Sequence, residues 1–167
     1  MELEESIKTA IVYEKKIRDI YLEGGRKVKD DYGRSFFQAM SADEQRHVDY
    51  LEYKLDQWRN TGKIVPERLQ TSIPSRKAIQ KEVQKITRQM KGEDRGIKQQ
   101  QLVRALKVEM ETSDFYRRMV AELSNEGRDL FARFLEIEES HIEAVQFELD
   151  YVSSTGYWFN IKEFDME

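Results

Sequence analysis

The chain has 167 residues, of which 39% are hydrophobic and 36% charged, with eight glycines and two prolines. This length suits one domain with its own core, and the abundance of Glu, Lys, Arg and Gln favours helices. The net charge of −4 gives no reason to expect nucleic acid as a partner, and the absence of cysteine excludes disulfides, iron–sulfur clusters and thiol catalysis within the chain.

No segment of the sequence predicts export or membrane insertion. The first ten residues lack a basic region followed by an apolar run, and no stretch of about 18 apolar residues is present. We therefore expect a cytoplasmic protein that has no membrane partner.

Four long stretches carry apolar residues at helical spacing and are predicted to be helices. They run over Leu3–Lys29, Gly33–Arg59, Ile97–Leu123 and Glu126–Val152. Turn-forming residues at Asp30–Gly33 and Ser124–Gly127 predict a tight link inside each pair, so each pair is expected to form an antiparallel hairpin. Gly24 and Gly25 fall inside the first stretch, where we expect close packing or a local kink in a continuous helix.

A long connection over about residues 61–96 separates the two pairs. Pro66 and Pro74 interrupt its first part, and residues 75–90 are predicted to form a helix capped by Ser75. Two hairpins joined by one long crossover is the connectivity of ferritin-like bundles. The predicted fold is therefore an all-α, ferritin-like antiparallel four-helix bundle over residues 1–152.

The last segment, residues 153–167, loses helical spacing and becomes aromatic. It contains Tyr157, Trp158, Phe159 and Phe164. We expect an extended tail that packs on the bundle or forms a dimer contact, and we do not interpret it as a cofactor-binding motif.

The two hairpins are related by an internal duplication. In the first helix of each, a tyrosine follows an Ala-x-x-x-Glu segment by seven residues: Tyr21 after Glu14, and Tyr116 after Glu109. In the second helix of each, a histidine follows a glutamate by three residues: His47 after Glu44, and His141 after Glu138. The chain has two histidines, and both belong to this repeat, which argues against chance.

The repeat predicts a site for two metal ions. Residues three apart lie on one face of a helix, so each Glu-x-x-His pair can present an oxygen and a nitrogen to the same region. A glutamate from each of two helices plus Glu-x-x-His from each of the other two is the arrangement of di-iron and di-manganese carboxylate proteins. The predicted ligands are Glu14, Glu44, His47, Glu109, Glu138 and His141, with Glu14 and Glu109 bridging or chelating from the opposite side. Two divalent ions would balance the four carboxylates, and without metal some carboxylates should bind protons.

Other acidic residues lie close to these ligands in sequence. Asp43 precedes Glu44, but Ile137 occupies the matching place in the other half, so we interpret Asp43 as a helix-surface residue and not as a group that orients a ligand. Glu111 and Glu139 are rotated away from the ligand positions by about 100° per residue, and we exclude them.

These motifs resemble the rubrerythrin-like branch of the ferritin-like superfamily. The resemblance covers nearly the whole chain, including the crossover and the tail over residues 156–164. It implies the same six ligands, and it matches Tyr21 and Tyr116 to tyrosines that lie near the metal site. We take both as candidate catalytic residues, with a hydrogen bond to a buried carboxylate as the simpler alternative.

The chain departs from that family in two features. It lacks the four cysteines of a rubredoxin domain, and Thr112 stands where the third helix of rubrerythrins carries a second glutamate, three residues after the first. That glutamate is associated with the metal movement that accompanies peroxide reduction in the family.

The resemblance implies a non-haem oxidoreductase that reacts with peroxide or dioxygen. We expect two iron ions, with manganese or zinc also compatible with the ligands. Electrons would come from an external donor such as a rubredoxin or another reductase, and we expect a homodimer or small homo-oligomer. The alternatives are a ferroxidase that handles iron for storage, and a non-catalytic ferritin-like protein whose metal is structural.

Overall fold

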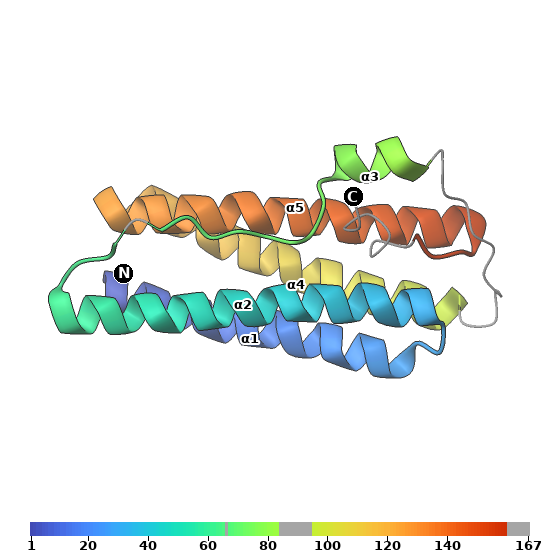
Figure 1. Ribbon diagram of the computed structural model, residues 1–167, viewed down its shortest axis with the longest axis horizontal. Helices are drawn as coiled ribbons and strands as arrows, with labels where there is room; N and C mark the ends of the chain where they lie inside the picture. The colour runs from blue at the N-terminus through green and yellow to red at the C-terminus, as the bar shows by residue number, and fades with distance from the viewer. Residues whose placement is uncertain (66, 84–94, 160–167) are drawn as a thin grey trace.

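The computed structural model describes residues 1–65, 67–83 and 95–159, which form a bundle of four long helices (Figure 1). The helices are α1 (Leu3–Lys27), α2 (Asp31–Thr61), α4 (Arg95–Glu122) and α5 (Asn125–Thr155), with the short α3 (Arg76–Val83) in the crossover. Within these residues there is no strand, so the predicted all-α, ferritin-like bundle is confirmed. None of the described helices carries an apolar stretch that would let it span a membrane.

The turn of the first hairpin lies two residues earlier in the chain than the sequence predicted. The side chain of Asp30 accepts a hydrogen bond from the backbone N–H of Gly33 (3.0 Å), so Asp30 caps a helix that begins at Asp31. Residues 31–33, which we predicted to belong to the link, therefore form the first turn of α2, and the connection consists of residues 28–30.

The second hairpin differs from the prediction in the same way. Helix α5 begins at Asn125, with Ser124 as its N-cap, and it continues to Thr155. It ends three residues later than predicted because Gly156 adopts a left-handed conformation (φ 74°), which terminates helices readily in a residue without a side chain.

Gly24 and Gly25 lie within a continuous α1, as predicted, and one of them permits close packing. A Cβ atom on Gly24 would lie 2.9 Å from the ring of Phe37, whereas the nearest atom to a Cβ on Gly25 would be 3.5 Å away. The ring of Phe37 is fully buried and therefore sits directly against the backbone of α1.

The bundle interior consists of two apolar clusters separated by a buried polar layer. One cluster includes Ile17, Met40, Val108 and Ala144, and the other includes Ile11, Val48, Phe115 and Ile137. Along every long helix, the residues of one cluster are separated from those of the other by a predicted ligand. On α1, for example, Glu14 lies between Ile11 of one cluster and Ile17 of the other. The sequence thus interrupts its apolar stripe at the same level on all four helices.

The crossover runs in extended form along the bundle beside α2 and α5 (Figure 1). Lys54 of α2 donates a hydrogen bond to the carbonyl of Val65 (2.6 Å). Arg133 of α5 donates to the carbonyl of Leu69 (2.8 Å). Side chains of both helices therefore hold this segment over the junction between the two hairpins.

The predicted crossover helix and the tail are each described in part. Ser75 precedes α3 and its Oγ accepts from the backbone N–H of Ala78 (3.3 Å), while the predicted continuation of this helix from residue 84 to 90 lies outside the described residues. Trp158 and Phe159 are buried, and Trp158 packs on Phe36 and Phe37, which supports the predicted packing role of the tail. Residues 160–167, including Phe164, lie outside the described part.

Candidate metal centre

The polar layer brings together side chains from all four long helices. The six predicted ligands, all fully buried, are Glu14 on α1, Glu44 and His47 on α2, Glu109 on α4, and Glu138 and His141 on α5. Their donor atoms form two groups of four, within each of which all atoms lie within 4.8 Å of one another. We call these the His47 position (Glu14, Glu44, His47, Glu138) and the His141 position (Glu44, Glu109, Glu138, His141). Three carboxylates and one imidazole are a donor set that suits iron, manganese or zinc.

The two positions share the glutamates of the Glu-x-x-His pairs. Glu44 lies between the two histidines: its Oε1 is 2.7 Å from Nδ1 of His141, and its Oε2 is 2.9 Å from Nδ1 of His47. Glu14 and Glu109, which we expected to bridge or chelate, each belong to one position only. The geometry therefore favours Glu44 and Glu138 for a bridging role, because both are common to the two groups.

Both histidines direct the same ring nitrogen toward the carboxylates. Nδ1 of His47 lies 3.2 Å from Glu14, and Nδ1 of His141 lies 3.6 Å from Glu109. The two rings are almost parallel, with an interplanar angle of 10° and centroids 5.3 Å apart. This arrangement follows the internal repeat and leaves the two Nε2 atoms facing away from the glutamates.

Several carboxylate oxygens of the site have no hydrogen-bond partner. Among the described residues, Oε2 of Glu109 and both oxygens of Glu138 are buried and accept no hydrogen bond. A buried acceptor without a donor costs about 1–3 kcal/mol, and more when it is charged. Such oxygens, converging from opposite helices, fit a bound cation well and fit a purely structural polar cluster poorly.

Burial and mutual repulsion shift the pKa values within the metal-free layer. Burial raises the pKa of Glu138 well above its usual value, and the charges of Glu14 and Glu44 raise it further. Burial alone would lower the pKa of His47, but Glu14 and Glu44 outweigh that effect and hold it well above its usual value. The expectation that the metal-free site binds protons agrees with these directions.

Each predicted tyrosine donates a hydrogen bond to a glutamate of the opposite hairpin. The hydroxyl of Tyr21 on α1 donates to Oε1 of Glu109, and the hydroxyl of Tyr116 on α4 donates to Oε1 of Glu14. Burial, followed by the neighbouring carboxylate charges, raises the pKa of both tyrosines well above their usual value, so both hydroxyls keep their protons. The two bonds hold one oxygen of each non-shared glutamate in place.

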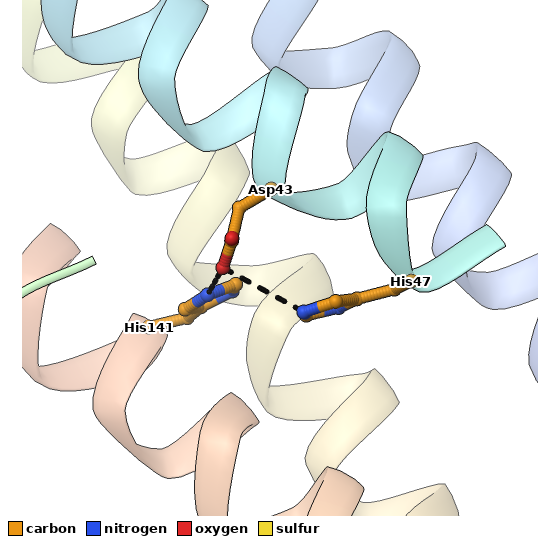
Figure 2. A group of neighbouring side chains, drawn as sticks. All are labelled: Asp43, His47 and His141. Atoms are coloured by element: carbon orange, nitrogen blue, oxygen red, sulfur yellow. Dashed lines mark hydrogen bonds and ion pairs between the residues drawn. The ribbon is translucent and has the colours of Figure 1, made fainter. Parts of the chain in front are cut away.

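The prediction that Asp43 lies on the helix surface is wrong. Asp43 is fully buried, and its Oδ2 lies 2.7 Å from Nε2 of His141 and 3.6 Å from Nε2 of His47 (Figure 2). The crossover creates this burial, because Thr71 donates to the same carboxylate (2.6 Å) and covers it. Burial alone would raise the pKa of Asp43, but the hydrogen bond and charge of His141 hold it well below its usual value.

Thr112 and the two excluded glutamates behave as the sequence predicted. Thr112 is buried, and its hydroxyl donates to the carbonyl of Val108 (2.8 Å), so this position supplies no further carboxylate. Glu111 is half-buried and Glu139 is exposed, and they form ion pairs with Lys16 (3.1 Å) and Arg117 (3.4 Å), respectively.

Comparison with known proteins agrees with this arrangement. A family model described as Rubrerythrin matches residues 5–149, which include all four long helices except their outermost residues. No curated protein and no solved structure matches the chain.

Proposed function

Because the chain belongs to the rubrerythrin family, we propose that it binds two divalent metal ions in the polar layer and uses them to reduce peroxide or dioxygen. The observation that carries this proposal is the convergence of four fully buried glutamates and two buried histidines on one point of the bundle.

Charge supports the binding of two divalent ions. The carboxylate of Asp43 is paired with the guanidinium of Arg46. Among the described residues, the four glutamates of the site have no lysine or arginine partner. Buried charges are destabilising unless they are paired or coordinate metal. Two divalent ions would neutralise four carboxylates and would supply partners for the unsatisfied oxygens of Glu109 and Glu138.

Each of the two ions would have its own glutamate and histidine ligands, and two further glutamates would be shared. Glu14 and His47 would hold one ion, Glu109 and His141 the other, and Glu44 and Glu138 would contact both. Tyr21 and Tyr116 would orient the two non-shared glutamates through their hydrogen bonds. The apolar clusters on both sides would limit the access of water to the layer.

Iron is the metal that we propose, with manganese or zinc as the other ions that this donor set accepts. Two ferrous ions would supply two electrons, enough to reduce hydrogen peroxide to two water molecules or dioxygen to hydrogen peroxide. Since the chain contains no cysteine and no second redox centre is evident in its sequence, the electrons that restore the ferrous state would come from a separate rubredoxin or reductase.

The test is anaerobic loading with ferrous ions, followed by addition of one equivalent of hydrogen peroxide or of dioxygen while the absorbance is recorded. We expect rapid oxidation at the wild-type site, and its loss in Glu138→Gln. The matched control is Glu139→Gln, which changes the next residue along α5 but removes only an exposed carboxylate.

The outcomes separate the proposal from its alternatives. Oxidation of many iron ions per chain by dioxygen would favour ferroxidase-type iron handling. Stoichiometric metal binding followed by no oxidation faster than that of free ferrous ion would indicate a structural metal, and it would contradict the proposed reaction.

A further inference from the structure

The two halves of the metal centre differ at one buried position. The repeat that aligns His47 with His141 also aligns Asp43 with Ile137. Both residues are buried, but only the aspartate offers a hydrogen-bond acceptor. The two histidines, which are otherwise related by the repeat, therefore have different surroundings on their Nε2 side.

Asp43 contacts the histidines unequally. Its Oδ2 lies within hydrogen-bond distance of Nε2 of His141, at 2.7 Å, but 3.6 Å from Nε2 of His47, which is too long for a hydrogen bond (Figure 2). Nε2 of His47 is buried and has no hydrogen-bond partner among the described residues. Nε2 of His141 is thus hydrogen-bonded to the Asp43 carboxylate, whereas Nε2 of His47 is near the same carboxylate but not hydrogen-bonded to it.

The crossover and α2 fix the position of the Asp43 carboxylate. The Thr71 hydroxyl donates to Oδ2 (2.6 Å), and the backbone N–H of Ser72 donates to Oδ1 (3.2 Å). Arg46, one turn along α2, also donates to Oδ1. A carboxylate held by donors from two segments is rigid enough to fix the orientation of the imidazole that it contacts.

Asp43 is a poor candidate for a metal ligand, although it forms a group with the two Nε2 atoms. Both of its oxygens already accept hydrogen bonds, and the Arg46 guanidinium lies against it. A second cation there would be repelled by that charge. The carboxylate is therefore suited to accept the proton of an imidazole whose other nitrogen binds metal.

We propose that Asp43 is a positioning residue that makes the His141 position bind metal more tightly than the His47 position, so that the two ions bind in a fixed order. The inference rests on the proposed metal-binding function. A carboxylate that accepts the distal N–H of a metal-binding histidine fixes its tautomer and increases its basicity, and losing such a partner typically weakens metal binding by about 10–100-fold.

The test is a titration of the metal-free protein with cobalt(II). Binding is measured by calorimetry and, in parallel, by the visible absorption of the bound ion. The wild type should bind two ions with resolved dissociation constants. Asp43→Asn should weaken the tighter step by about 10–100-fold and change the weaker step little. Asp49→Asn is the matched control, since Asp49 is exposed on the same helix, and it should leave both constants unchanged.

A second measurement uses the unaltered protein and does not depend on the stability of a variant. Crystals of wild type grown with one equivalent of cobalt(II) should show anomalous density at the His141 position and little at the His47 position. Equal occupancy of the two positions, or an equal effect of Asp43→Asn on both steps, would overturn the inference while leaving the proposed function intact. Failure of the wild type to bind cobalt(II) at all would instead count against the proposed function.

Discussion

Tyr21 on α1 donates its hydroxyl hydrogen to Glu109 on α4, across the interface between the two hairpins. The internal repeat generates the reciprocal bond from Tyr116 to Glu14. Each tyrosine thus supports a ligand of the hairpin to which it does not belong. The pair of bonds ties the hairpins together at the level of the metal centre and contributes to the orientation of both non-shared glutamates.

Tyr21→Phe should destabilise the metal-free protein. The substitution leaves a buried carboxylate oxygen of Glu109 without a donor, which costs about 1–3 kcal/mol. Tyr116→Phe should have an effect of similar size, because its bond is the counterpart in the repeat. Urea unfolding in the presence of a chelator measures both, with Tyr53→Phe as the control, since the Tyr53 hydroxyl pairs with Gln57 at the surface. Losses no larger than that of the control would show that the bonds contribute nothing to stability.

Metal should stabilise the wild-type protein strongly. Ferrous, manganous or zinc ions at about 100 times the dissociation constant add about 2.7 kcal/mol per site, which corresponds to a rise in Tm of about 5–10 °C for a chain of this size. Glu138→Gln should lose most of this gain. In the presence of a chelator, however, the Tm of Glu138→Gln should be no lower than that of the wild type, because burial already favours the uncharged form of Glu138. Scanning calorimetry with and without metal checks both statements, and an unchanged wild-type Tm would contradict the first.

Replacement of Gly24 and of Gly25 in α1 by alanine should have opposite effects on stability. Gly24→Ala places a Cβ 2.9 Å from the buried ring of Phe37, and overpacking of this kind costs about 1–3 kcal/mol. In Gly25→Ala the new Cβ would lie 3.5 Å from the Cβ of Phe37, an ordinary van der Waals distance, and the substitution should stabilise the helix by up to about 1 kcal/mol. Chemical denaturation of the two variants provides the comparison. Stabilisation by both substitutions would mean that Phe37 moves aside at little cost.

Glu148 should make stability depend on pH. Burial raises its pKa well above the usual 4.5, an effect that the N–H of Phe159 only partly offsets. A carboxyl group with a raised folded-state pKa contributes stability that is complete below pH 4.5 and is lost as the pH rises toward that pKa. Wild type should therefore lose stability relative to Glu148→Gln between pH 5 and pH 8.

The measurement is the free energy of unfolding of both proteins at the two pH values. Glu143→Gln, which alters an exposed residue on the same helix, is the control and should track the wild type. A constant difference between wild type and Glu148→Gln across this range would contradict the assignment.

The repeat explains why so much of the site could be predicted from the sequence. Helical spacing alone puts His47 one turn after Glu44, and the duplication then supplies the matching pair on α5. The helix ends were less predictable, because Asp30 and Gly156 act through capping geometry that shifts each boundary by a few residues.

The role of Asp43 could not be predicted from the repeat. Its burial depends on Thr71 and Ser72, which return to it from an extended crossover that carries no helical periodicity. The matching residue Ile137 suggested the wrong conclusion, since Thr71 and Ser72 of the crossover bind the Asp43 carboxylate, whereas the apolar side chain of Ile137 can accept no hydrogen bond. The three-residue spacing of Asp43 and Arg46 was the one clue in the sequence to a paired aspartate.

Six buried side chains are proposed to hold the two metal ions. Anomalous diffraction at the iron edge, from crystals loaded anaerobically with ferrous ions, tests this proposal most directly. We expect two peaks about 3.5–4 Å apart, one beside Nδ1 of His47 and one beside Nδ1 of His141. A single peak, peaks outside the polar layer, or no peak from protein that remains folded would rule out a two-metal site formed by these six residues.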